Sequence, residues 1–305
     1  MYKAQNSIMK KTVILLTILF VNLGLLTTSC GDANSDSKLD DNTEIESKDS
    51  SDDTQVHSIE IDTTELDYEF LPPSPIQIAS ILKKANMPYE EGLTNSVENL
   101  GKYSSKFKQS LNFGVYSCDL AYCVTNDKYE EAAKFLKASR DLSTKIGLEA
   151  IFRSDKIIER FESNMGNQDS IMEILFNIQM ITDDYIHDNE LRDLSVIYFT
   201  GAWVEGMNIA THTILGNNDH KISVLLSEQM TIARSIVKGL RSAEDQNDEI
   251  IDLTDHIEEV VNAYHELWSV KKEGENIEYL DAELEHEEVV EISNMILELR
   301  EEITL

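Results

Sequence analysis

The stretch VIYFTGAWVEGMNIATHTIL, residues 196–215, decides the fold of this chain, because it is the most apolar of the segments that have a helical period. Within it, Ala202, Gly206 and Ala210 repeat every four residues and form a stripe of small side chains on one face of a helix. Small side chains let a second helix approach closely. We therefore expect a buried helix here, at the centre of a helical core.

Four further segments carry apolar residues at intervals of three and four, which is the period of an amphipathic helix. They cover residues 171–181, 222–240, 253–268 and 289–303. All four prolines precede residue 89, so none interrupts these segments. We predict an all-α fold, either a multi-helix bundle or an array of helical hairpins, in one domain over residues 71–305. The last segment could close this bundle or pair with another chain, and we favour closure.

One predicted hairpin, LAYCVTNDKYEEAAKFLKAS at residues 120–139, resembles the tetratricopeptide helix pair. Tyr129, Ala132 and Leu136 stand where that family has a tyrosine, an alanine and a large apolar residue in its second helix. Only one such unit is visible. We interpret the match as convergent packing, because any tight helical hairpin needs small residues where its helices cross.

The N-terminus has the pattern of a secretory signal peptide. Lys10 and Lys11 precede an apolar run, residues 12–26, and small residues follow this run up to position 29. A transmembrane anchor is the alternative, but the run is shorter than the roughly 20 residues that span a bilayer and is interrupted by Asn22. We predict a signal peptide at residues 1–29, with either Met1 or Met9 as the start.

The end of this run, LLTTSC at residues 25–30, resembles the lipobox of bacterial lipoproteins. In that family the peptide is cut before the cysteine, which is then acylated, so the resemblance implies that Cys30 carries lipid. The family prefers leucine three residues before the cysteine, whereas Thr27 stands there and Leu26 lies one residue further away. Several acyl chains would hold the protein stably on a membrane. An ordinary signal peptide is the alternative.

Residues 30–70 are predicted to form a disordered acidic tether behind the lipidated cysteine. Between residues 31 and 70 there are 14 acidic side chains and two lysines, and few large apolar residues. Such a segment cannot bury enough surface to offset the entropy of ordering it. It also lacks the glycine that a calcium-binding EF-hand loop requires. The formal net charge of −31 makes nucleic acid and anionic lipid head groups poor partners.

Two predicted helices carry polar side chains on apolar faces. Glu205, Asn208 and His212 follow one another at i, i+3 and i+7, and therefore share a face. Tyr116, Asp119 and Cys123 form a similar stripe. A buried carboxylate must be paired or protonated. We favour a structural partner for Glu205, with Arg234 as a candidate; the alternative is a ligand pocket in which Tyr116, Asp119 and Trp203 line the cavity around Glu205, Asn208 and His212.

Enzyme signatures are missing from the sequence. There is no Gly-x-Ser-x-Gly elbow, phosphate-binding glycine loop or His-Glu-x-x-His motif. Glu283 with His286 is the one Glu-x-x-His pair of the kind that di-iron bundles use twice. Cys118 and Cys123 would lie about 140° apart on one helix, so we predict two buried free thiols. We expect no metal and no cofactor, and consider an enzyme less expected than a non-enzyme.

Two longer stretches carry a broader resemblance. FLPPSPIQIASILKKANMPYEEGLTN, residues 70–95, and LNFGVYSCDLAYC, residues 111–123, resemble helical lipoproteins of the Bacteroidetes, with similarity over most of residues 70–215. The resemblance implies a helical fold and a lipid-anchored location in the cell envelope, in the outer membrane at its periplasmic or surface face. It implies no catalytic residue.

Two functions remain open from the sequence. We expect an interaction or accessory module of the cell envelope, whose partners are the membrane, through the N-terminal lipid, and another envelope protein. The alternative is a small-ligand-binding protein or enzyme that uses the polar face around Glu205 and His212.

Overall fold

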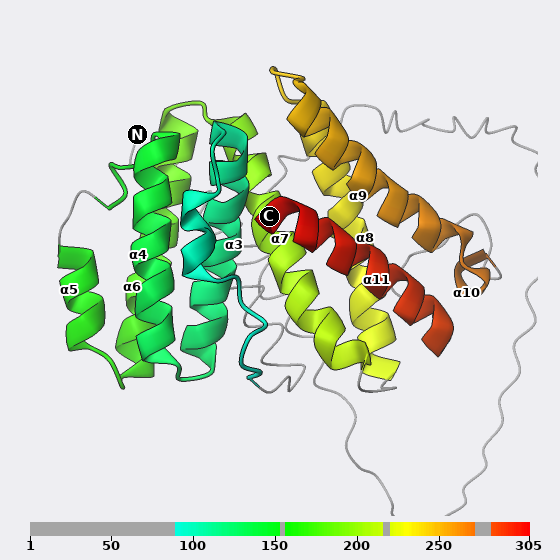
Figure 1. Cartoon of the computed structure of the whole chain (residues 1–305), viewed down its shortest axis with the longest axis horizontal. Helices are drawn as coiled ribbons and strands as arrows, with labels where there is room; N and C mark the ends of the chain where they lie inside the picture. Colours follow the sequence, from blue (N-terminus) through cyan, green and yellow to red (C-terminus); the bar gives the residue numbers. More distant parts are fainter. Residues whose placement is uncertain (1–88, 153–155, 216–219, 272–281) are drawn as a thin grey trace, which may run out of the picture. The chain divides into compact units, whose positions relative to one another are not determined.

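The computed structural model describes residues 89–152, 156–215, 220–271 and 282–305. For residues 213–215 and 220–225 it describes the backbone alone. The predicted signal peptide, Cys30 and the predicted tether lie outside these residues. Every described element is a helix, which confirms the all-α prediction, and the helices belong to one compact unit (Figure 1). In chain order they are η2 (Val97–Gly101), α3 (Lys106–Thr125), α4 (Tyr129–Ile146), α5 (Lys156–Ser163), α6 (Gln168–Asp188), α7 (Arg192–Leu215), α8 (His220–Arg241), α9 (Asp248–Glu266), α10 (Trp268–Lys271) and α11 (His286–Thr304).

Helices α3 and α7 pack against each other with their backbones in contact. A Cβ atom at Gly114 of α3 would overlap the carbonyl oxygen of Tyr198, and one at Gly201 of α7 would overlap the carbonyl oxygen of Leu111. Only glycine permits this approach. The segment 196–215 therefore lies at the centre of the fold, as its apolar sequence predicts, and the crossing uses Gly201 next to the predicted small residue Ala202.

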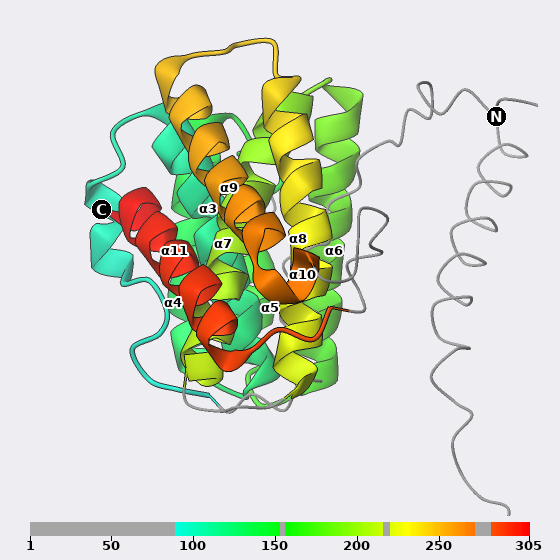
Figure 2. The same cartoon turned by 90° about the vertical axis from the view of Figure 1, so that its right-hand side faces the viewer.

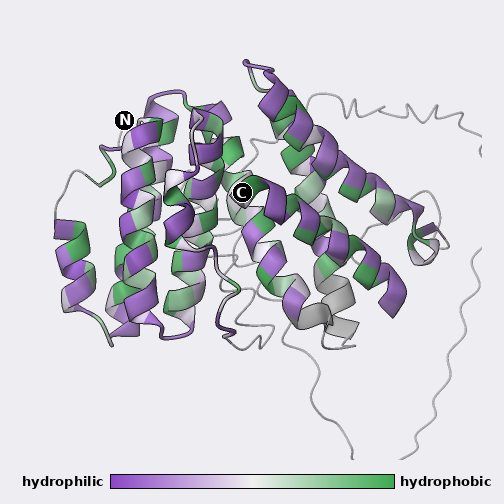
Figure 3. Cartoon of the chain, in the orientation of Figure 1, coloured by the Kyte–Doolittle hydropathy of each residue, from purple (hydrophilic) through white to green (hydrophobic). Residues whose placement is uncertain are grey.

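Two hydrophobic clusters lie on either side of this pair. One joins α3 and α7 to α8, α9 and α11, and the other joins them to α4, α5 and α6. Figure 1 shows the corresponding helices on the two sides of α3. Figure 3 shows hydrophobic and hydrophilic residues interspersed along most helices. The apolar residues that recur at helical spacing in the sequence thus lie on helix faces that pack into one or the other cluster.

Helix α11 packs against other helices of this chain and closes the bundle, as predicted. It contacts α7, α9 and α3, and its residues Ile292, Ile296 and Leu299 are buried. Figure 2 shows α11 lying across the helices behind it. The apolar residues of α11 are therefore buried against other helices of this chain.

Helices α3 and α4 form the predicted hairpin. Asp127 has a positive φ of 60° in the turn, and the Tyr129 hydroxyl donates to its Oδ1 atom at 2.7 Å. Ala132 and Leu136 are fully buried against α3. Cys118 and Cys123 are both buried free thiols on α3, as predicted. Within the described ranges, no helix is both long enough and apolar enough to cross a bilayer.

Candidate functional site

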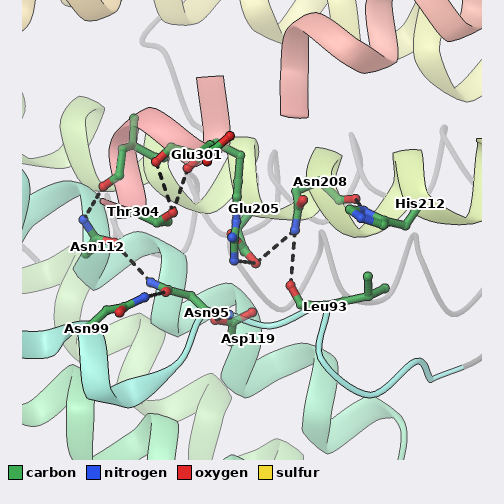
Figure 4. A network of polar contacts seen from close by, with 12 residues as sticks. Leu93, Asn95, Asn99, Asn112, Asp119, Glu205, Asn208, His212, Glu301 and Thr304 are labelled. Carbon is green, nitrogen blue, oxygen red and sulfur yellow. Dashed lines mark hydrogen bonds and ion pairs between the residues drawn. The ribbon is translucent and has the colours of Figure 1, made fainter. Parts of the chain in front are cut away.

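A cluster of polar side chains is buried where α3, α7 and α11 meet the segment that precedes η2 (Figure 4). We call it the carboxylate cluster, and its members are Asn95, Asp119, Glu205, Asn208 and Arg300. Asp119 and Glu205 are fully buried and Asn95 and Asn208 nearly so. The cluster exists because the polar residues of α3 and α7 face each other near the close crossing of these helices.

Arg300 of α11 neutralises the charge of Glu205. Its Nε donates to Glu205 Oε2 at 3.0 Å and its Nη2 donates to Oε1 at 3.2 Å. A two-point arginine–carboxylate contact is one of the stronger polar contacts in proteins. Burial disfavours the charged guanidinium, but the Glu205 carboxylate outweighs it and raises the pKa of Arg300. A structural partner for Glu205 was expected, and it is Arg300 of α11, not the candidate Arg234.

Asn208 completes the surroundings of Glu205. Its side-chain amide donates to Glu205 Oε1 at 3.3 Å and to the backbone oxygen of Leu93, also at 3.3 Å. Both oxygens of the carboxylate are therefore engaged by groups of this chain. The arrangement ties the segment before η2 to α7 and, through Arg300, to α11.

Asp119 lies beside Glu205 in a different electrostatic situation. Its Oδ2 atom accepts a hydrogen bond from the backbone N–H of Asn95 at 3.1 Å, and among the described residues its Oδ1 atom has no hydrogen-bond partner. Burial and the neighbouring Glu205 carboxylate raise the pKa of Asp119 well above its usual range, although Arg300 and the Asn95 amide oppose this rise. One arginine cannot neutralise two carboxylates, so we interpret Asp119 as the protonated acid beside Glu205.

Further amides and hydroxyls connect this cluster to the end of α11. Asn95 donates to the Tyr103 hydroxyl at 2.8 Å and to Asn112 at 3.3 Å. Asn112 in turn donates to the backbone oxygen of Ile303 at 2.8 Å. The last carbonyl groups of a helix lack partners within the helix. Asn112 thus satisfies one of them and holds the C-terminal end of α11 against α3.

The sequence-predicted site residues separate into two groups. Asp119, Glu205 and Asn208 meet in the carboxylate cluster, and Tyr116 lies nearby, where its hydroxyl donates to the backbone oxygen of Ser96 at 2.9 Å. Burial raises the pKa of Tyr116, so its hydroxyl remains a donor.

Trp203 and His212 do not belong to this group. Trp203 is buried, but its indole nitrogen donates to Gln229 of α8 at 3.1 Å. Trp203 precedes Glu205 by two residues and therefore lies on nearly the opposite side of the helix. His212 shares the face of Glu205 but lies two turns further along, where it is exposed and its Nδ1 contacts the backbone oxygen of Asn208 (Figure 4). The structure therefore does not bring the imidazole to the carboxylates.

Four members of the network were not anticipated: Arg300, Asn95, Tyr103 and Asn112. Asn95 and Asn112 lie within the two stretches that carry the lipoprotein resemblance, in the Gly-Leu-Thr-Asn turn and just before Phe-Gly-Val-Tyr-Ser. Arg300 lies in a strongly acidic helix, where an arginine is expected at the surface. No local signal in the sequence pairs it with Glu205.

Comparisons with protein-family models, with curated proteins and with solved structures found no match. Across the part of the chain that the structure describes, no three histidine, cysteine, aspartate or glutamate side chains converge as a metal site would require. The function of this chain must therefore be inferred from its own residues and their geometry.

Proposed function

We propose that this chain is a lipid-anchored interaction or accessory module of the bacterial cell envelope. Cys30 would carry the lipid, residues 30–70 would form the tether, and the helical domain would bind another envelope protein. The support for the anchor is the sequence pattern of residues 1–30. The support for an interaction role comes from the helical domain.

The contacts of Glu205 favour a structural role over a ligand-binding one. Its two oxygens are occupied by Arg300 and Asn208, and it is fully buried. A ligand would have to displace an internal ion pair, which leaves a buried charge without compensation. The alternative function around Glu205 and His212 is therefore the weaker proposal.

The observation that carries the interaction proposal is the outer side of α6. Phe176, Met180 and Ile181 are exposed by 58, 48 and 45%, respectively, which is unusual for large apolar side chains grouped on one helix. Aromatic residues and methionine are enriched in protein interfaces. The same helix contains five acidic residues and neither lysine nor arginine. We call Phe176, Met180 and Ile181 the α6 face.

Site-specific photocrosslinking in intact cells tests the interaction. A photoreactive phenylalanine analogue at position 176 is expected to capture one envelope protein, whereas the same analogue at Thr144, exposed on α4, is not. Introducing Met180→Ser into the chain that carries the analogue should reduce capture, because it removes apolar contact area without touching the core. Equal capture from both positions, or capture that Met180→Ser does not change, would contradict the interaction proposal.

The anchor is tested separately. Cys30→Ala should release the protein from the membrane fraction while leaving the helical content, measured by circular dichroism, unchanged. If the variant remains in the membrane fraction, the lipid-anchor part of the proposal is wrong.

A further inference from the structure

A small hollow opens between α3, α4 and α6, away from the carboxylate cluster. Its volume is about 40 Å³, which exceeds the space that one water needs. Its lining includes three half-buried residues, Ser117, Ile178 and Gln179, and two buried residues of α4, Leu136 and Ser139. The remaining wall is mostly apolar and includes Phe113, Leu120, Phe152, Leu175 and Tyr198.

The polar groups of the hollow differ in whether they already have partners. The Ser117 hydroxyl donates to the backbone oxygen of Phe113 at 2.7 Å, and the Thr182 hydroxyl donates to that of Ile178 at 2.8 Å. The Gln179 amide donates to Asp183 at 2.7 Å. These groups are satisfied within the chain.

Ser139 is different. It is 2% exposed, and its hydroxyl has no hydrogen-bond partner among the residues described. A serine in a helix usually satisfies its hydroxyl on the preceding turn, as Ser143 does one turn further along α4, where it donates to the backbone oxygen of Arg140 at 2.7 Å. A buried hydroxyl without a partner is costly, so its position in the lining of a hollow indicates a missing partner.

We propose that this hollow binds a small uncharged molecule that has an aliphatic body and one hydrogen-bonding oxygen. The oxygen would pair with the Ser139 hydroxyl, and the aliphatic part would contact the apolar wall. None of the described lining side chains is charged, so a carboxylate or an ammonium group would lose its hydration without gaining a counter-ion. The volume limits the bound part to a few heavy atoms.

A series of four-carbon probes tests this inference on the full chain. The probes are 1-butanol, 1-chlorobutane, butyrate and n-butylammonium, and the readout is the NMR shift of the Leu136 and Ile178 methyl groups. We expect 1-butanol to give saturable shifts and to bind about tenfold more tightly than 1-chlorobutane, which corresponds to one neutral hydrogen bond. The two charged probes should bind more weakly than 1-butanol.

Three variants locate the site. Ser139→Ala should remove the preference for 1-butanol over 1-chlorobutane, while Ser143→Ala, a matched loss of a serine hydroxyl on the same helix, should keep it. Ser117→Leu, at a half-buried lining position, should weaken every probe, and it provides a second test if Ser139→Ala does not fold. The inference is overturned if 1-butanol gives no saturable shift, as expected of a hollow that holds only water, or if Ser139→Ala retains the preference.

Discussion

Replacing Asp119 by asparagine should change how the stability of the domain depends on pH. Asparagine keeps the shape of the side chain, and its oxygen can still accept from the Asn95 amide. Its Nδ2 group takes the place of one carboxyl oxygen and carries no titratable proton. The substitution therefore removes one titration and preserves the contacts of Asp119.

The sign of the effect follows from the raised pKa of Asp119. Below the ordinary aspartate pKa, near 4, the carboxyl is protonated in both the folded and the unfolded chain. Above it, the unfolded chain loses the proton while the folded chain keeps it, so the free energy of unfolding falls as pH rises towards the folded-state pKa. The slope is about 1.4 kcal/mol per pH unit for one proton. The Asp119→Asn variant should not show this decrease in the free energy of unfolding.

Urea unfolding, followed by circular dichroism between pH 4 and pH 8, measures the difference. The variant should gain about 1.4 kcal/mol over the wild type for each pH unit, up to the pH at which Asp119 ionises in the folded protein. The pH at which the two curves become parallel then reports the folded-state pKa. Asp252→Asn, at an exposed site on α9, serves as the control for removing an aspartate. Parallel curves for wild type and Asp119→Asn throughout this range would refute the assignment of the proton to Asp119.

Three further outcomes are expected from the packing. Arg300→Gln should lower the free energy of unfolding by about 3–5 kcal/mol, because it leaves the Glu205 charge buried without a counter-ion, and adding Glu205→Gln should restore part of this loss in a double-mutant cycle. Gly201→Ala should lower the free energy of unfolding by about 1–3 kcal/mol by forcing α3 and α7 apart, whereas Gly101→Ala, where a Cβ meets nothing within 4 Å, should change the melting temperature little. Asn112→Ala should lower the free energy of unfolding by about 1–3 kcal/mol and increase hydrogen exchange in the last turn of α11, because a backbone oxygen there loses its buried donor.

The helical fold could be predicted because apolar periodicity is a local property. The segment 196–215 is mostly apolar, and the structure accordingly surrounds α7 with neighbours from both hydrophobic clusters. The hairpin at residues 120–139 was recognisable for the same reason, since its small and large apolar residues recur at helical spacing.

The candidate site could be predicted only in part. Glu205 and Asp119 were recognisable because a carboxylate on an apolar face must find a partner or keep a proton. The identity of the partner was not recognisable, because Arg300 is 95 residues away in sequence and its pairing depends on how α11 crosses α7. Trp203 shows the same limit, since its burial was predictable but the helix that it faces was not.

The position of Arg300 in the last described helix has a consequence for the order of assembly. A chain that is synthesised or exported from its N-terminus presents Glu205 long before the arginine that neutralises it. Until α11 arrives, the interface between α3 and α7 contains an acidic group that favours water over the core. We therefore expect fragments that stop before α11 to remain open and to be susceptible to proteases. The ion pair thus couples closure of the domain to the presence of α11, so that chains without this helix can be distinguished from chains that contain it.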